Sequence, residues 1–192
     1  MRAISLFVMT SLDGYVYGPG GDLSWARNDG EAFSPERSES TDAILLGRRT
    51  YEMMASSWPT PEAREQSPEI AEFMNDRRKL VASHEPFEPD WENTTVVSGD
   101  IPAEVAKLKE QPGGSIIVLG SNELCVSLVP AGLVDVFQVL VHPVVLGDGT
   151  SLFAGLLEPV YLTRTGSREF GDGTVLLTYE PAADDEAAGE RA

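Results

Sequence analysis

The stretch Ala43-Ile44-Leu45-Leu46-Gly47-Arg48-Arg49-Thr50-Tyr51-Glu52 runs from a short apolar segment through a glycine into a polar, amphipathic segment. This order predicts a buried strand over about 43–46 that turns at Gly47 into a helix from Arg48 to about Ala55. The first backbone N–H groups of a helix have no partner within it and carry the positive end of the helix dipole. Two neighbouring arginines add forked donors that match phosphate oxygens. The stretch therefore predicts a strand–turn–helix unit that binds a phosphorylated ligand.

Two further predicted strands end in turns of similar chemistry. The strand over 79–83 ends in a serine and is followed by His84, and the strand over 115–119 enters a helix through Gly120-Ser121-Asn122. Open α/β sheets bind ligands outside the carboxyl ends of their strands. A glycine between strand and helix is also ordinary turn chemistry, and paired arginines often lie on a solvated face. The coincidence of three such turns is what favours a binding site.

The remaining pattern sets the fold class. Strands and helices alternate over the first two-thirds of the chain, which indicates a mostly parallel sheet covered on both faces. The last third is rich in strands with hairpin-like turns, so we expect the sheet to end in antiparallel strands. The predicted strands cover about 3–9, 43–46, 79–83, 94–97, 115–119, 134–141, 160–167 and 174–180, and helices are expected at about 48–55, 68–78, 102–111 and after 122. The fold class is therefore α/β, with a mixed, mostly parallel central sheet flanked by helices.

Length and charge restrict the organisation and the partners. The 192 residues fit one domain over 1–180, followed by an acidic tail over 181–192 that has no apolar period and is expected to be disordered. With 31 acidic and 14 basic residues the net charge is −17, so we expect neither nucleic acid nor anionic membranes as partners. The longest apolar run, near 116–119, is too short to span a bilayer, and no signal-peptide pattern opens the sequence. We therefore expect a cytoplasmic protein.

Several other kinds of site are not indicated. The sequence contains no G-x-G-x-x-G after a strand, no G-x-x-x-x-G-K-[ST] and no H-E-x-x-H. Its two histidines, His84 and His142, are too few and too far apart to predict a metal site, so none is expected. The single cysteine, Cys125, lies on an apolar helix face, where a buried structural thiol is the simpler interpretation than a nucleophile.

Five short motifs occur in an order that resembles one known superfamily. They are Ser11-Leu12-Asp13-Gly14, Gly21-Asp22-Leu23-Ser24-Trp25, Leu46–Glu52, Val118-Leu119-Gly120-Ser121 and Leu146-Gly147-Asp148-Gly149. Together they resemble the dihydrofolate reductase-like superfamily, and most closely the stand-alone relatives of the riboflavin-biosynthesis reductase domain. The resemblance spans about residues 2–180. It implies a dihydrofolate reductase-like fold and NADPH as the cofactor.

The resemblance also implies roles for the three turns. The turn at 47–50 would bind the phosphates of NADPH, with Arg48 or Arg49 and the pair at 83–84 holding the 2′-phosphate. The turn at 120–124 would lie beside the pyrophosphate and the nicotinamide, although this chain has Ser121 where dihydrofolate reductases usually carry a second glycine. The residues so assigned to the cofactor are Gly47, Arg48, Arg49, Thr50, Ser83, His84, Gly120, Ser121, Asn122 and Leu124.

Catalytic and substrate residues are less well defined by the sequence. Asp13 follows a buried strand and is the candidate that orients or polarises the substrate, while its alternative role is that of a turn former before glycine. Asp29 and Glu31 are candidate proton donors. Trp25 and Tyr51 either form a wall of the substrate pocket or pack in the core.

Two functions from different classes remain open at this point. The first is an NADPH-dependent reductase that transfers a hydride to a small conjugated substrate, pterin-like or pyrimidine-like, held beneath the 13–25 loop. The second is a nucleotide-binding module of the same fold without reductase activity. In either case the strand-rich segment from Val134 to Val145 could supply an apolar surface, which in this family would serve homodimerisation.

Overall fold

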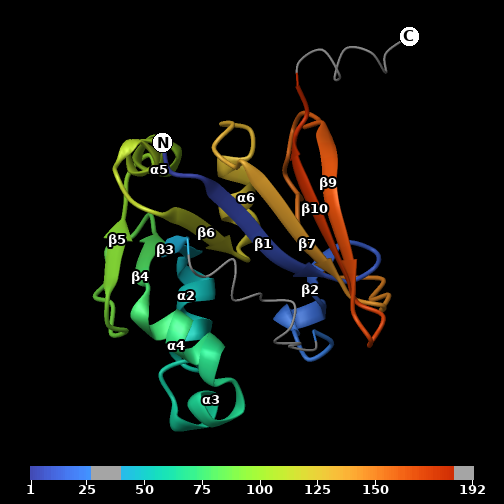
Figure 1. The fold of residues 1–192 in the computed structure, drawn as a ribbon, viewed down its shortest axis with the longest axis horizontal. Helices are drawn as coiled ribbons and strands as arrows, with labels where there is room; N and C mark the ends of the chain where they lie inside the picture. Colours follow the sequence, from blue (N-terminus) through green and yellow to red (C-terminus); the bar gives the residue numbers. More distant parts are fainter. Residues whose placement is uncertain (27–39, 184–192) are drawn as a thin grey trace.

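An eight-stranded sheet organises the protein in the computed structural model, which describes residues 1–26 and 40–183 (Figure 1). The strands follow the order β5-β4-β3-β6-β1-β7-β10-β9 across this sheet. In chain order they are β1 (Ile4–Thr10), β3 (Thr41–Gly47), β4 (Arg78–Ala82), β5 (Thr94–Val97), β6 (Ser115–Leu119), β7 (Val136–Val141), β9 (Leu162–Glu169) and β10 (Val175–Pro181). The helices are α2 (Arg48–Ala55), α3 (Pro61–Gln66), α4 (Pro68–Asp76), α5 (Ile101–Glu110) and α6 (Asn122–Leu128), with a 3-10 turn η1 (Pro19–Gly21).

The direction of the strands agrees with the sequence pattern. From β5 to β7 every neighbouring pair is parallel, whereas β10 pairs antiparallel with both β7 and β9. The predicted fold class, a mostly parallel sheet with antiparallel C-terminal strands, is therefore confirmed. Because the parallel strands point the same way, the turns that follow β1, β3, β4 and β6 gather at one edge of the sheet.

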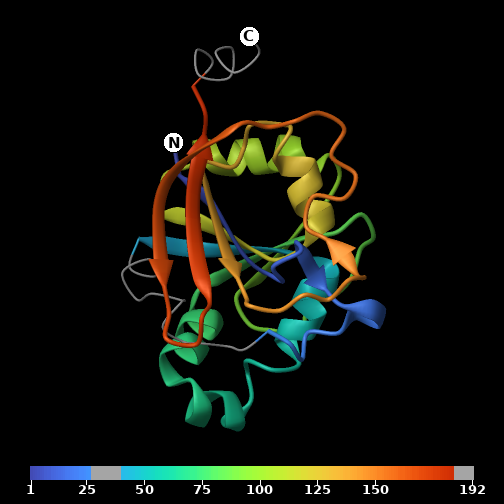
Figure 2. The same ribbon diagram turned by 90° about the vertical axis from the view of Figure 1, so that its right-hand side faces the viewer.

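Continuous apolar runs in the central strands supply both faces of this sheet. In β3, Ala43 and Leu45 belong to one core, and Ile44 and Leu46 belong to the other. The first core lies beneath α5 and α6, and the second lies beneath α2 and α4, so helices cover opposite faces of the sheet (Figure 2). A strand buried on both faces needs apolar residues at every position, which is why these segments do not alternate.

Two local elements differ from the sequence prediction. The sequence analysis expected no helix between about 55 and 68, but α3 begins at Pro61, and Thr60 before it accepts a hydrogen bond of 3.2 Å from the backbone N–H of Ala63. In addition, β2 (Tyr15–Tyr17) pairs antiparallel with β8 (Thr150–Ser151) in a small second sheet. This pair joins segments that are far apart in sequence, and no local pattern marks it.

The expected apolar surface from Val134 to Val145 is not found over most of that segment. β7 lies between β1 and β10, and Val134, Phe137 and Leu140 are all buried. Val145, just past the strand, is the only large hydrophobic side chain of this segment that is largely exposed. The segment is apolar because it crosses the core, so the location expected for a dimer surface requires correction.

Within the described ranges, no helix is both long enough and apolar enough to cross a membrane.

Candidate cofactor-binding site

The three turns singled out in the sequence meet in space because β3 lies between β4 and β6. Gly47, the last residue of β3, is the register partner of Ala82, after which Ser83 and His84 follow. On the other side β3 pairs with β6, which leads into Gly120. The sheet therefore brings residues from three distant parts of the sequence to one edge.

Gly47 and Ser121 are the point of closest approach between two of these turns. A Cβ placed on Gly47 would lie 2.2 Å from the hydroxyl oxygen of Ser121 and 3.1 Å from its Cβ. Gly47 has an ordinary extended backbone, with φ −75°, so its glycine is needed for this contact rather than for its conformation. Gly120 and Ser121 both have positive φ values, 59° and 60°. The serine thus occupies a left-handed conformation that glycine adopts more easily.

The helices that begin at these two turns both lack a side-chain cap. Neither Gly47, before α2, nor Ser121, before α6, caps its helix with a side-chain hydrogen bond. Free N–H groups in a first helical turn attract anions, because each is an unpaired donor at the positive end of the helix dipole. Two such helix ends in contact form a surface suited to a group with several phosphate oxygens, such as a pyrophosphate.

The two arginines of α2 differ in their surroundings. The Arg48 Nε lies 2.9 Å from a Glu52 carboxylate oxygen, and its Nη1 lies 3.6 Å from one of Glu85. Its guanidinium also lies over the Phe87 ring, 4.9 Å from the centroid. Arg49 is exposed and forms no ion pair within residues 1–26 and 40–183. A phosphate approaching this surface therefore meets an uncompensated charge at Arg49 and a compensated one at Arg48.

Ser83 and His84 lie in the neighbouring turn, with different exposure. Ser83 is buried, and its hydroxyl donates to the backbone oxygen of Glu85 at 2.6 Å, which fixes the turn. His84 is exposed beside it. The salt bridge of Arg48 to Glu85 ties this turn to α2. Of the predicted pair, His84 is thus the side chain free to reach a ligand.

The third turn offers backbone groups and small side chains. Asn122 begins α6 and is half-buried, whereas Leu124 is 4% exposed and packs in the core beneath α5 and α6. The side chain of Leu124 is therefore not available to a ligand, and only its backbone N–H in the first turn of α6 could serve one. Burial raises the pKa of the Cys125 thiol to about 12, which agrees with a structural cysteine.

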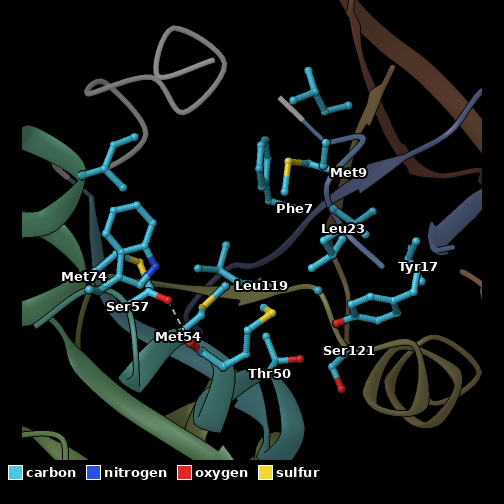
Figure 3. A pocket seen from close by; sticks show the side chains of 18 residues that line it. Phe7, Met9, Tyr17, Leu23, Thr50, Met54, Ser57, Met74, Leu119 and Ser121 are labelled. Atoms are coloured by element: carbon cyan, nitrogen blue, oxygen red, sulfur yellow. Dashed lines mark hydrogen bonds between the residues drawn. The ribbon is translucent and has the colours of Figure 1, made fainter. Parts of the chain in front are cut away.

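A cavity of about 300 Å³ opens beside the first and third turns. Thr50, Gly120 and Ser121 line it on the side of the helix ends, and the remaining walls come from β1, β2, α2, α4, β6 and β7 and from the loops at 23–26 and 57–58 (Figure 3). None of the described residues in its wall carries a charge. The arrangement places an apolar chamber directly next to a surface suited to phosphate.

Asp13 does not lie in this chamber. Its carboxylate accepts hydrogen bonds from the Ser11 hydroxyl at 2.7 Å, from the Gly147 N–H at 2.7 Å and from the Leu146 N–H at 3.1 Å. The Ser11 hydroxyl and then the Gly147 N–H lower the pKa of Asp13 to about 2, so the carboxylate is ionised at neutral pH. The structure corrects the catalytic assignment of Asp13: the residue fixes the turn after β1 to the loop at 144–149.

Tyr51 belongs to the core rather than to the cavity wall. It is 2% exposed, its hydroxyl donates to Asp90 at 3.2 Å, and that same hydroxyl accepts from the Trp91 N–H at 3.0 Å. Its ring packs against Phe87 and Trp91, with centroid distances of 5.6 and 6.1 Å. The sequence left open whether Tyr51 forms a wall of the pocket or packs in the core. The structure places it in the core, so its assignment as a substrate contact is corrected.

Trp25 lies beside the cavity without lining it. Its indole N–H donates to the backbone oxygen of Asp22 at 3.1 Å, and its ring meets His142 edge-on at 5.5 Å. Its neighbours Leu23 and Ala26 do line the cavity. The candidate proton donors Asp29 and Glu31 lie outside the described residues.

The sequence did not point to the cavity walls themselves. Four of the five methionines of the chain line the cavity, and Tyr17 does so from β2. The lining methionines are Met9, Met53, Met54 and Met74. Met53 and Met54 lie in the helix that follows Gly47, and this position was the only sequence signal that linked a methionine to the site. Met9 and Met74 lie far from that turn in sequence and come to the cavity only when the chain folds.

Comparison with known proteins agrees with this geometry. A family model described as the RibD C-terminal domain matches residues 2–176. The chain belongs to this family. The uncharacterized protein YyaP of Bacillus subtilis (strain 168) is 30% identical over 178 residues, which cover 93% of this chain and 94% of that protein. The resemblance inferred from the five motifs is thereby confirmed.

Solved structures of RibD-like and dihydrofolate reductase-like proteins share the fold. A putative riboflavin biosynthesis protein from Shewanella sp. PV-4 superposes with a TM-score of 0.71 at 23% identity, covering 95% of this chain and all (100%) of that one. A dihydrofolate reductase from Enterococcus faecalis, complexed with NADP(H), superposes with a TM-score of 0.66 at 16% identity, covering 94% of this chain and 97% of that one. At these identities the likeness shows the fold, and the RibD C-terminal family places the chain among reductase-like proteins.

Proposed function

We propose that this protein is an NADPH-dependent reductase that transfers a hydride to a small conjugated substrate. The observation that carries the proposal is the contact between two uncapped helix ends, at Gly47 and Ser121, on the rim of an uncharged cavity. A dinucleotide needs both surfaces, because its phosphates are anionic and its reactive ring must lie out of water.

The residues present fit such a cofactor. The first-turn N–H groups of α2 and α6 would hold the pyrophosphate, and Arg49 with His84 would hold the 2′-phosphate. Thr50, Gly120 and Ser121 separate these donors from the cavity, so they would lie along the path from the pyrophosphate to the nicotinamide. NADPH supplies a hydride when bound, and the second hydrogen of the reduction then reaches the substrate as a proton.

A second candidate function is nucleotide binding without reduction. The described residues of the cavity wall include no carboxylic acid, and this observation favours that candidate. A reductase would then draw its proton from solvent or from a hydroxyl group, whereas a binding module needs no proton at all.

Isotope transfer separates the two candidates. NADPH carrying deuterium at the transferred position of its nicotinamide is incubated with the full chain and a panel of pterins, pyrimidines and quinones, and the products are analysed by mass spectrometry. A reductase incorporates the label into one class of acceptor. Binding of NADPH with no label in any product supports the binding module, and absence of NADPH binding contradicts the reductase.

A further inference from the structure

Three contacts hold the side chain of Arg48 in a defined orientation. Its Nε lies 2.9 Å from a carboxylate oxygen of Glu52, one turn further along α2, and its Nη1 lies 3.6 Å from a carboxylate oxygen of Glu85, in the turn after β4. The guanidinium lies over the Phe87 ring, with Cζ 4.9 Å from the ring centroid. Arg48 therefore joins the start of α2 to the turn after β4.

These contacts occupy the edge and one face of the guanidinium. Its donors lie in its plane, so the two carboxylates contact the edge, whereas an aromatic ring packs against the face. Phe87 covers one face, and 37% of the Arg48 side chain is still exposed. The face opposite the ring is thus the one that a ligand can cover. Because two carboxylates already balance its charge, that face suits a flat ring better than an anion.

The neighbours of Arg48 indicate which part of a nucleotide would reach this face. Arg49 follows Arg48 in α2, and His84 precedes Glu85 in the turn after β4. Arg49 and His84 are the residues that the proposed function assigns to the 2′-phosphate. In NADPH that phosphate is carried by the ribose attached to adenine, so the adenine lies one sugar away from it. Nucleic acid bases stack on arginine guanidinium groups and gain a cation–π contribution there.

We infer that Arg48, supported by Phe87, is the surface on which the adenine ring of the nucleotide stacks, and that Arg48 does not bind the 2′-phosphate. The inference rests on the proposed function, because it concerns the adenine of the same cofactor. It gives different roles to two arginines that are equivalent in the sequence. Arg49 distinguishes NADPH from NADH, whereas Arg48 binds the part that the two nucleotides share.

Lysine substitutions test the two roles separately, because lysine keeps the charge and lacks the planar group. The full chain and its variants are titrated with NADPH and with NADH by calorimetry. Arg48→Lys should weaken both nucleotides by the same factor, about three- to tenfold. Arg49→Lys should weaken NADPH alone. Arg64→Lys is the control for the substitution itself, because Arg64 is exposed in α3, and it should change neither affinity.

Nuclear magnetic resonance distinguishes stacking from phosphate binding without any turnover. The Nε–Hε signal of Arg48, assigned by its absence from the spectrum of Arg48→Lys, is followed during titration with NADH. A base stacked on the guanidinium shields the protons that lie against its face, so the Hε signal should move upfield. A new hydrogen bond from Arg48 to a phosphate would move the signal downfield.

Three results would overturn the inference. Unchanged NADH affinity in Arg48→Lys would show that the residue does not contact the shared part of the nucleotides. A loss restricted to NADPH, or a downfield shift of the Hε signal, would show that Arg48 is a phosphate ligand. Absence of nucleotide binding by the wild-type chain would contradict the proposed function, and this inference with it, before any variant is compared.

Discussion

At the scale of single residues, Arg48 and Arg49 are neighbours whose guanidinium groups have different contacts. Arg48 already has Glu52 and Glu85 within ion-pair distance, while Arg49 is exposed without an ion pair to any described residue. Arg49→Ala should therefore lower NADPH affinity by about 1.5–3 kcal/mol and leave NADH affinity unchanged. Arg48→Ala should have the smaller effect, because its charge is largely compensated. Calorimetric titration of both variants with both nucleotides measures the difference.

Equal losses of NADPH affinity in Arg48→Ala and Arg49→Ala would show that the two carboxylates do not weaken Arg48 as a phosphate ligand. Unchanged NADPH affinity in both variants would show that the 2′-phosphate does not bind at α2. From the sequence, the two arginines were equivalent candidates, because nothing local shows that Glu85 reaches across from the next turn.

Lys79 is a buried cation in the core beneath α2 and α4. Its side chain is 0% exposed, and its ammonium donates to the backbone oxygens of Met74 at 3.2 Å and Asn75 at 2.8 Å. It also lies 4.6 Å from the centroid of the Trp91 ring. Lys79 therefore pairs with the last carbonyl groups of α4, which no further helical turn can satisfy.

This burial predicts a pH dependence of stability. Burial lowers the pKa of Lys79 from 10.5 to about 8, against the attraction of Asp76 and Glu92. Between these two values the unfolded chain holds more protons than the folded one, so the contribution of Lys79 to the free energy of unfolding rises with pH. Denaturant titrations from about pH 8 to pH 10.5 should show this rise in the wild type and not in Lys79→Met. The exposed Lys107→Met serves as the control and should keep the rise; a rise of equal size in Lys79→Met would contradict the prediction.

At the scale of elements, the contact between the ends of α2 and α6 depends on Gly47. In Gly47→Ala the new Cβ would overlap the Ser121 hydroxyl, which lies only 2.2 Å from its position. We expect a loss of about 1–3 kcal/mol in the free energy of unfolding, together with weaker NADPH binding, because the two helix ends must separate.

The double variant Gly47→Ala/Ser121→Gly tests that contact separately from other effects of the alanine. Both atoms near the added Cβ belong to the Ser121 side chain, and glycine readily adopts the φ of 60° at that position. Ser121→Gly should therefore restore most of the stability and nucleotide affinity lost in Gly47→Ala. Additive losses in the double variant, measured by denaturant unfolding and calorimetry, would show that the two turns are not coupled.

Sequence patterns predicted those elements whose signals are local. The strand over 115–119 and the helix over 48–55 have the expected bounds, because an apolar run and a glycine turn mark them directly. The sequence analysis did not predict α3, although Thr60 and Pro61 provide a cap and a first-turn proline. The β2–β8 pair was not predictable, because its register depends on contacts between residues 15–17 and 150–151.

At the scale of the whole molecule, we propose that two chains form a homodimer through an apolar patch at Leu12 and Val145. Each of these residues is 66% exposed, and the chain segments meet where the Leu12 N–H donates to the Val144 oxygen at 2.8 Å. Light scattering should give the mass of two chains, and Leu12→Asp combined with Val145→Asp should give one. Leu157→Asp is the control, because Leu157 is 95% exposed elsewhere in the chain and its replacement should leave the dimer intact. A monomeric wild type would contradict the proposal.

Of the candidate site, the sequence predicted the three phosphate-binding turns but not the cavity beside them. Its three turns each carry a local signal, and the parallel order β4-β3-β6 brings them together. The cavity has no such signal, because Met9, Tyr17 and Met74 enter it from separate elements. Asp13 was misassigned because an acid after a buried strand looks the same whether it faces a pocket or, as here, the backbone of Gly147.

The measurement that tests the account most directly is a calorimetric titration of the full-length wild-type chain with NADPH and with NADH. The account predicts micromolar binding of NADPH and at least about tenfold weaker binding of NADH, because the helix ends bind the phosphates common to both and Arg49 binds the 2′-phosphate. Failure of both nucleotides to bind, or equal affinity for the two, would contradict it.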